Sequence, residues 1–363
     1  MTSSEKPCIS GGRSILVVHN AFSRFVRIDC ALLAKNYRVT VRYENSLRSL
    51  NFRQIWKQVK SHDLVYCWFA SWHSLLPVLA ARLQHKPSVV VVGGYDTASV
   101  PLAGYGSQRG GLRKFLVRTV IKLATHLIAN SHAARLEAIQ NAGARPDKIT
   151  TVYHGIACPN GPFPRDRERM ALTVGAVCRE NLLRKGLLPF VEASRLLPDV
   201  SFLHAGPHLD ESIVELRNAA GPNVEFLGMV PDDKLTELYE RASVYVQASL
   251  HEGFGMSLAE AMAAGCIPVA TRYGSLPEVL GETGVYLLNA TPQAVAEGIK
   301  VGLCESPDSR LRAQRRIRES FSLAQRSSGL KHVIDGVLSR ASMPNVSVAS
   351  TKPAPGIRTH FPS

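Results

Sequence analysis

Short apolar runs alternate with longer amphipathic stretches along the first part of the chain. Five of these runs have the length and β-branched content of buried strands: residues 15–19, 39–41, 64–68, 89–92 and 127–129. Apolar positions at helical spacing fill the intervals, most regularly over 72–83 and 112–123. Strands that alternate with helices in this way predict βαβ units and a parallel sheet.

The alternation stops over 159–167, where three prolines, a glycine and mixed charges indicate a linker, and then restarts. The predicted elements that follow are strands at 172–177, 201–205, 224–227, 244–247 and 267–271, and helices at 189–197, 235–241 and 256–264. We therefore predict an α/β fold of two doubly wound Rossmann-like domains, 1–160 and 161–320, that face each other across a ligand-binding cleft. A helix over 321–338 is expected to return to the N-terminal domain, and residues 339–363 are expected to be a disordered tail.

Length and composition exclude several classes of protein. The 363 residues are 45% hydrophobic and 20% charged, which excludes a fully disordered chain, a collagen and a coiled coil. No apolar run approaches the roughly 18 residues that a membrane-spanning helix needs, and no secretory signal is visible. The seven cysteines are scattered without CxxC spacing, which argues against disulfides and structural zinc. We therefore expect a cytoplasmic protein.

The charge is concentrated in the N-terminal half. Residues 1–165 carry 22 Lys and Arg against seven Asp and Glu, a net charge of +15, whereas residues 166–363 carry 21 and 22, a net charge of −1. This asymmetry predicts that the first domain faces an anionic partner. Nucleic acid, a phospholipid surface and a phosphorylated acceptor each fit, but nucleic acid is disfavoured because no motif of that kind is present.

The segment 249–270 contains the strongest candidate site. A turn with Gly253 and Gly255 leads into a helix predicted from Met256, and the free N–H groups and positive dipole end of a helix suit a diphosphate. Two acidic residues, Glu252 in the turn and Glu260 in the helix, accompany this anion site. The alternative interpretation is that Glu252 is a solvated loop carboxylate and that Glu260 forms a capping box with Ser257.

The residues 252–256 (EGFGM) and 260–269 (EAMAAGCIPV) resemble the signature of retaining glycosyltransferases of family 4, which are two-domain GT-B enzymes that use nucleotide-diphosphate sugars. The resemblance covers nearly all of 13–338. It implies that Glu252 is catalytic and contacts the donor sugar near the reacting centre, and that Glu260 binds the ribose hydroxyls. It also places the turn and the helix start in the donor-binding set: Gly253, Phe254, Gly255, Met256 and Ser257.

Two further loops of the second domain carry family features. Residues 174–186 resemble the first strand and loop of that domain, where an Arg and a Lys usually hold the diphosphate, and Lys185 matches the lysine. The usual arginine is replaced by Ala176, and either Arg179 or Arg184 could substitute for it, unless both are solvated loop charges. Met229 and Val230 stand where backbone atoms of the family usually meet the nucleobase.

The first domain is less typical of the family. The loop 19–29 lacks the glycine pair that many members carry after the first strand. Asp96 follows Gly93 and Gly94 at the end of a predicted strand, where parallel sheets place ligands, so it is a candidate catalytic carboxylate on the acceptor side. The alternative is an Asx-type cap of the following loop. Core packing is expected for Trp68 and Trp72.

The implied function is transfer of a sugar from a nucleotide-diphosphate sugar to an acceptor with retention of configuration. No metal or other cofactor is expected. The acceptor is expected to be a sugar, a lipid-linked compound or a phosphorylated compound, and the basic first domain favours the last two over a free neutral sugar. The alternatives are a nucleotide-sugar 2-epimerase of the same fold and a non-catalytic glycosyltransferase-like partner subunit.

A membrane partner is predicted from residues 112–127. One helical face carries Leu112, Leu116, Val120, Leu123 and Leu127, and another carries Lys114, Arg118 and Lys122. Such a helix can lie on an anionic bilayer, which would place the protein peripherally on the inner face of the membrane. The alternative is that the apolar face packs on the sheet while the charges face water.

Overall fold

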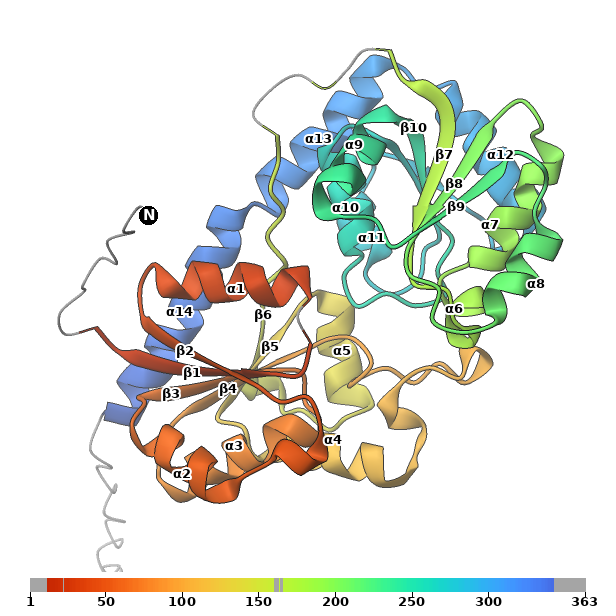
Figure 1. The fold of residues 1–363 in the computed structure, drawn as a ribbon. Helices are drawn as coiled ribbons and strands as arrows, with labels where there is room; N and C mark the ends of the chain where they lie inside the picture. The colour runs from red at the N-terminus through yellow and green to blue at the C-terminus, as the bar shows by residue number, and fades with distance from the viewer. Residues whose placement is uncertain (1–11, 22, 160–162, 164–165, 343–363) are drawn as a thin grey trace, which may run out of the picture.

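Two α/β domains lie side by side in the structure, a computed structural model that describes residues 12–21, 23–159, 163 and 166–342 (Figure 1). Each domain contains a six-stranded sheet whose paired strands are all parallel. Helices cover both faces of each sheet, which confirms the predicted doubly wound architecture. The predicted linker falls mostly on residues outside the described part of the chain.

The N-terminal sheet has the order β2-β1-β3-β4-β5-β6. Its strands are β1 (Ser14–His19), β2 (Arg38–Tyr43), β3 (Leu64–Trp68), β4 (Ser88–Val92), β5 (His126–Ala129) and β6 (Ile149–Thr151), and its helices are α1 (Arg24–Ala34), α2 (Phe52–Lys60), α3 (Trp72–Leu83), α4 (Gly111–Leu123) and α5 (His132–Gln140). The strands β1, β3 and β4 are almost entirely apolar, as expected for strands buried on both faces, whereas the edge strand β2 is largely exposed. One apolar cluster joins the sheet to α2, α3 and α4, and another joins its opposite face to α1.

The C-terminal sheet has the order β12-β11-β10-β7-β8-β9. Its strands are β7 (Glu168–Val174), β8 (Ser201–Ala205), β9 (Val224–Gly228), β10 (Ala242–Gln247), β11 (Ile267–Ala270) and β12 (Val285–Tyr286), and its helices are α6 (Arg179–Arg184), α7 (Leu187–Ala193), α8 (Ser212–Ala219), α9 (Asp232–Arg241), α10 (Met256–Ala263), α11 (Leu276–Leu280), α12 (Pro292–Leu303) and α13 (Pro307–Ser320). The strand order reverses between β7 and β10, so the loops that follow these two strands diverge. Ligands bind at such a switch point in open parallel sheets.

A long last helix, α14 (Leu323–Ser342), runs back along the N-terminal domain beside α1 (Figure 1). The buried guanidinium of Arg326 donates to both carboxylate oxygens of Asp29 in α1, at 2.9 and 2.7 Å, and Tyr66 of β3 donates to the same carboxylate. The helix extends four residues past the predicted boundary at 338, so the predicted tail begins too early. Residues 343–363 lie outside the described part of the chain.

Candidate functional site

A cavity of about 300 Å³ lies between the two domains, at the carboxyl ends of their strands. From the N-terminal domain it is lined by residues that include Phe69, Gly94 and Tyr95, and from the C-terminal domain by residues that include Lys185 and the turn 252–257. The sequence prediction of a ligand site around this turn therefore corresponds to a real cavity, and both domains contribute to its walls.

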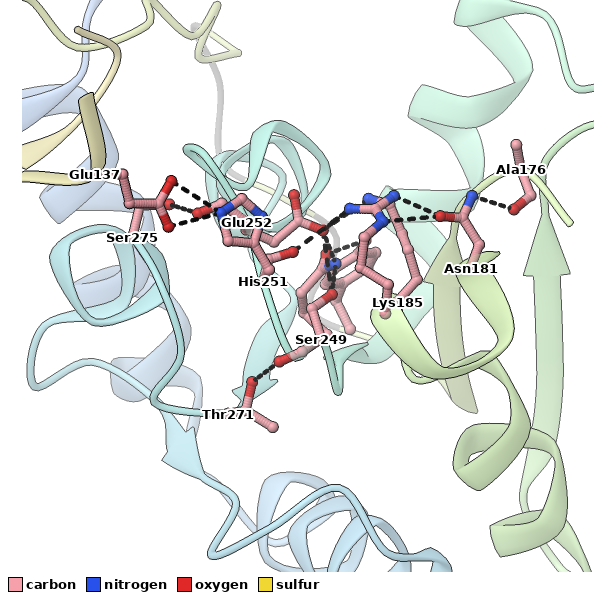
Figure 2. Close-up of polar contacts among 12 residues, drawn as sticks. Glu137, Ala176, Asn181, Lys185, Ser249, His251, Glu252, Thr271 and Ser275 are labelled. Carbon is pink, nitrogen blue, oxygen red and sulfur yellow. Dashed lines mark hydrogen bonds and ion pairs between the residues drawn. The ribbon is translucent and has the colours of Figure 1, made fainter. Parts of the chain in front are cut away.

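Glu252 is held in place by three donors that converge on one of its oxygens (Figure 2). Oε1 accepts from Lys185 Nζ at 2.8 Å, Gln247 Nε2 at 3.0 Å and Ser249 Oγ at 3.1 Å, while no hydrogen bond from the described residues reaches Oε2. Burial alone would raise the pKa of Glu252, but the charges of Lys185 and Arg184 hold it below its usual value. Glu252 is thus an ionised, oriented carboxylate at the cavity.

Lys185 reaches this position because the turn after α6 passes close to the end of β10. Gly186 has a φ of 66°, and a Cβ at this position would lie 2.1 Å from the carbonyl oxygen of Ala248. Only glycine tolerates both the left-handed conformation and this close approach. The side chain of Lys185 is 18% exposed and lines the cavity, so its charge is available to an anionic ligand.

The two candidate arginines have different surroundings, and neither is a free cation in the cavity. Arg184 lines the cavity, but its guanidinium donates to Asn181 Oδ1 at 2.9 and 2.6 Å and stacks over the ring of Tyr105 at 4.4 Å. Arg179 points elsewhere, since its side chain is 77% exposed and pairs with Glu215. The structure therefore does not bring Arg179 to the site, and it gives Arg184 a supporting position behind Lys185.

Glu260 lies one turn inside α10, and the predicted capping box with Ser257 is not formed. The N-cap of α10 is Gly255, in the left-handed region with a φ of 92°, so Ser257 lies within the first turn. The Glu260 carboxylate instead faces Arg24 of α1 across the cleft at 3.1 Å, and Tyr239 donates to it at 3.4 Å. Burial raises the pKa of Glu260, and the charge of Arg24 opposes that rise.

The turn that carries Glu252 touches the N-terminal domain directly. A Cβ on Gly253 would lie 1.9 Å from the carbonyl oxygen of Gly93, so two glycine backbones meet at this point. Ser131 Oγ donates to the carbonyl oxygen of Gly253 at 2.8 Å, and His251 Nε2 lies 2.8 Å from the Glu137 carboxylate of α5. The neighbours of the candidate catalytic residue are therefore fixed by contacts between the domains.

Asp96 caps the loop after β4. It is 3% exposed, and its carboxylate accepts from the backbone N–H groups of Ala70, Gly93 and Gly94 at 3.0–3.2 Å. Burial raises the pKa of Asp96, although these three donors favour the ionised form. Asp96 therefore caps the loop, as the alternative interpretation expected, and its catalytic role on the acceptor side stays a prediction.

A second cavity, of about 470 Å³, lies within the N-terminal domain. Phe69 and Tyr95 line both cavities, and Asp96 forms part of the wall of the second. Trp72 of α3, which was expected to be a core residue, is only half-buried and faces this cavity. This second space therefore adjoins the interdomain cavity on the predicted acceptor side.

Three further predicted donor residues lie on two different segments of the C-terminal domain, after β9 and after β10. Met229 and Val230 follow β9, and the Met229 side chain is 73% exposed. Phe254 is 3% exposed and packs in the apolar core while also forming part of the cavity wall. Their part in donor binding stays a prediction.

Two residues at the cleft were missed by the sequence analysis. Arg24 stands at the start of α1, directly after the loop that lacks the usual glycines, and its position beside that loop was the available signal. Asn130 follows β5 at its carboxyl end and is 3% exposed. Its Oδ1 is buried at the cavity and has no hydrogen-bond partner among the described residues.

Across residues 12–342, apart from the undescribed gaps, no three or more His, Cys, Asp or Glu side chains gather as a potential metal site. None of the described helices combines the length and the apolar character that spanning a bilayer requires.

The fold is that of GT-B glycosyltransferases. The structure resembles the crystal structure of Anabaena Alr3699/HepE in complex with UDP and glucose, with a TM-score of 0.71 and 17% sequence identity. The match covers 89% of this chain and 100% of that chain. At this level of identity the likeness establishes the architecture only.

The family is established by the sequence. Residues 17–158 match the family described as Glycosyltransferase Family 4, and residues 168–303 match the family described as Glycosyl transferases group 1. The chain therefore belongs to the group 1, family 4 glycosyltransferases, as the two-glutamate motif predicted.

Curated relatives are distant. The chain is 25% identical over 187 residues to a phosphatidylinositol N-acetylglucosaminyltransferase subunit from Arabidopsis thaliana, a match that covers 50% of this chain and 42% of that protein. It is 23% identical over 364 residues to the D-inositol 3-phosphate glycosyltransferase of Mycolicibacterium gilvum, which covers 93% of this chain and 77% of that protein. The chain thus spans less than half the length of the first of these relatives.

Proposed function

We propose that the protein transfers a sugar from a nucleotide-diphosphate sugar to an acceptor with retention of configuration, at the cavity between its domains. The observation that carries this proposal is the Lys185–Glu252 pair, which lies beside the N-terminus of α10 at the strand-order reversal. A cation and an oriented carboxylate at an anion-binding helix end suit a donor with a diphosphate next to its sugar.

The donor would lie along the C-terminal wall of the cavity. The diphosphate would meet Lys185 and the N–H groups at the start of α10, and the sugar would face Glu252. The ribose would lie on Glu260 and the nucleobase near Met229 and Val230. The proposal assigns the diphosphate charge to these groups without a metal ion.

The chemistry follows from this placement. As the bond between the anomeric carbon and the diphosphate oxygen breaks, negative charge grows on the diphosphate and positive charge grows on the sugar. Lys185 and the helix dipole stabilise the negative charge on the diphosphate, and Glu252 stabilises the positive charge on the sugar. The acceptor oxygen bonds to the anomeric carbon on the same face, and the departing phosphate takes the acceptor proton. No protein side chain is assigned as the general base, since Asp96 is occupied as a cap.

The acceptor would bind on the N-terminal side and is proposed to be lipid-linked or phosphorylated. The net charge of +15 over residues 1–165 supports an anionic acceptor. The two curated relatives are named for phosphorylated inositol compounds, which is consistent with this class.

A thermal-shift screen tests donor binding. UDP, GDP and ADP are added separately to the full chain, because a ligand that binds only the folded state raises the melting temperature. One of them is expected to stabilise the wild type and to stabilise Lys185→Met much less, with the exposed-lysine variant Lys234→Met as the control. Failure of all three nucleotides and their sugars to shift the wild type would contradict the proposal. Binding without sugar transfer or donor hydrolysis would instead favour the non-catalytic alternative.

A further inference from the structure

The helices on one face of the N-terminal sheet form a basic layer. Figure 1 shows α2, α3 and α4 together beneath this sheet, on the face opposite α1 and α14. These three helices contain no Asp or Glu. They carry eight Lys and Arg residues, of which Lys114 is half-buried and the other seven are exposed: Arg53, Lys57, Lys60, Arg82, Arg113, Arg118 and Lys122. The chain has no acidic residue at all between Asp96 and Glu137. The layer is therefore complementary to an extended anionic surface.

Two large apolar side chains project from the same layer at the start of α4. Leu112 is 71% exposed and Phe115 is 67% exposed, and they are neighbours on the helix at i and i+3 spacing. The predicted apolar face is thus partly wrong, because the fully buried residues of α4 are Val117, Val120 and Ile121 and not Leu112. Exposed apolar side chains beside Lys and Arg are the arrangement that inserts into the interface of an anionic bilayer.

The second cavity borders the same helix, α4. Its wall from α4 is formed by Arg113, Leu116 and Val117, and Leu112 lies one helical turn before Leu116. Arg113 Nη1 donates to the hydroxyl of Tyr95 at 2.7 Å, so the cavity has a cation held in position beside aromatic walls. The rest of the lining is mixed, with aromatic and aliphatic side chains, polar side chains such as Ser71 and Ser107, and the Asp96 carboxylate, which is already bonded to backbone N–H groups. Apolar walls with polar groups and a fixed guanidinium suit a phosphorylated headgroup that carries an apolar chain.

We propose that the layer of α2, α3 and α4 docks on an anionic bilayer, with Leu112 and Phe115 inserted, so that the second cavity receives a phosphorylated lipid directly from the membrane. That this lipid is the acceptor rests on the proposed function, whereas the docking does not. Each basic residue near an anionic surface strengthens binding about fivefold, so several acting together give stable but salt-sensitive attachment. The adjoining interdomain cavity then brings the docked lipid to the donor site.

Vesicle flotation tests the docking. The full chain is mixed with vesicles of phosphatidylcholine alone, or of phosphatidylcholine with phosphatidylglycerol, at low and at high salt. We expect binding to the anionic vesicles at low salt, release at high salt and little binding to the neutral vesicles. The variant Leu112→Ser/Phe115→Ser should lower the partition coefficient about tenfold or more. The matched control is Leu288→Ser, which removes a leucine that is 98% exposed on the C-terminal domain.

Insertion is measured separately with Phe115→Trp. The fluorescence of the added tryptophan, taken as the difference between the variant and the wild type, should be quenched by brominated acyl chains in anionic vesicles. Unchanged vesicle binding of Leu112→Ser/Phe115→Ser, or no quenching at position 115, would overturn the proposal and leave a basic surface that suits soluble polyanions such as nucleic acid. The thermal shift by a nucleoside diphosphate, measured on the same variants, reports on the donor site alone. Absence of docking by the wild type with that shift intact contradicts only this inference, whereas absence of the shift in the wild type contradicts the proposed function.

Discussion

Arg24 in the first turn of α1 and Glu260 in α10 form an ion pair across the interdomain cleft, with 3.1 Å between Nη1 and Oε1. Arg27, one turn further along α1, pairs with Asp232 of α9 at 2.9 Å. The two pairs differ in burial, because the Glu260 side chain is 13% exposed and that of Asp232 is 59% exposed. The buried pair therefore controls the charge state of the proposed ribose-binding carboxylate.

We predict that Arg24→Gln makes nucleotide binding more sensitive to acid. Burial already raises the pKa of Glu260, and the loss of the Arg24 charge raises it further. Because the neutral carboxylic acid is the weaker acceptor for ribose hydroxyls, the affinity of the variant should fall at a higher pH than the affinity of the wild type. The measurement is the Kd of the stabilising nucleoside diphosphate at a series of pH values.

The control for this experiment is Arg27→Gln in the same helix. Its partner is exposed, so the pH profile of nucleotide binding should match that of the wild type. Overlapping profiles for Arg24→Gln and the wild type would mean that Arg24 does not set the protonation of Glu260.

The two glutamates should separate chemistry from binding. Glu252→Gln is predicted to lower kcat about a hundredfold or more, because Glu252 faces the position where positive charge develops in the transition state. Glu260→Gln is predicted to raise the donor KM about tenfold with a smaller effect on kcat, because ribose binds equally in the ground and transition states. Steady-state kinetics with saturating acceptor measures both parameters.

The thermal stability of Glu260→Gln provides a check on the fold. Since α10 is capped by Gly255 and not by Ser257, no stability loss of the kind expected for a broken capping box should occur. A near-normal kcat for Glu252→Gln would remove its catalytic assignment and favour the non-catalytic alternative.

The contact between Gly253 and Gly93 predicts a steric sensitivity. Gly253→Ala would place a methyl group 1.9 Å from the Gly93 carbonyl oxygen, so the domains must separate or the turn must shift. We expect kcat/KM to fall about tenfold or more, since a small displacement of Glu252 disrupts its alignment with the substrate. The control is Gly336→Ala, whose added Cβ has only the Arg340 guanidinium nearby, at 4.0 Å. Wild-type kcat/KM in Gly253→Ala would show that the domains need not approach this closely during turnover.

The pair of Lys185 and Glu252 predicts a pH dependence of stability. The pKa of folded Glu252 is held below its usual value, so the pair contributes stability above the unfolded pKa and loses it as pH falls through the folded pKa. Lys185→Met should therefore cost about 3 kcal/mol at neutral pH, and the difference from the wild type should shrink in acid. Urea denaturation, followed by circular dichroism at several pH values, measures the free energy of unfolding of the variant and of the wild type.

Lys234 offers a matched surface pair for that experiment, because it bonds Glu237 with both side chains more than half exposed. Lys234→Met should change stability by less than about 0.5 kcal/mol at every pH. A pH-independent loss in Lys185→Met would mean that the lysine acts through packing and not through its charge.

Most strands of both sheets could be predicted because they are buried on both faces and therefore read as continuous apolar runs. The two-residue edge strand β12 has no such run and was not predicted. An apolar run does not show where its strand begins, and β7 starts at Glu168, four residues before the predicted start at Leu172. The first helix was expected only as part of the general alternation and without bounds, because Arg24, Phe25 and Arg27 interrupt its apolar pattern. In the structure Phe25 lines the cavity, and the two arginines pair with residues of the C-terminal domain.

The candidate site was only partly predictable for a related reason. Glu252 lies in a turn whose glycines and following helix pointed to an anion site, whereas Lys185 was assigned to that site through the family resemblance of 174–186. Which arginine lies behind them depends on the direction of α6, and sequence alone could not show that Arg184 turns inward while Arg179 turns toward Glu215. The capping role of Asp96 depends on N–H groups brought by two separate loops, at Ala70 and at Gly93 and Gly94.

The position of α14 has a consequence for how the protein is made. The N-terminal domain buries Arg326, Leu330 and Ile334 of this last helix against its own sheet, and Asp29 in its first helix has no other cationic partner among the described residues. During synthesis, the first domain to leave the ribosome therefore cannot complete its core until α14 has emerged, after the helices α12 and α13 that complete the core of the second domain. The domain that is translated first should thus be the last to finish its packing.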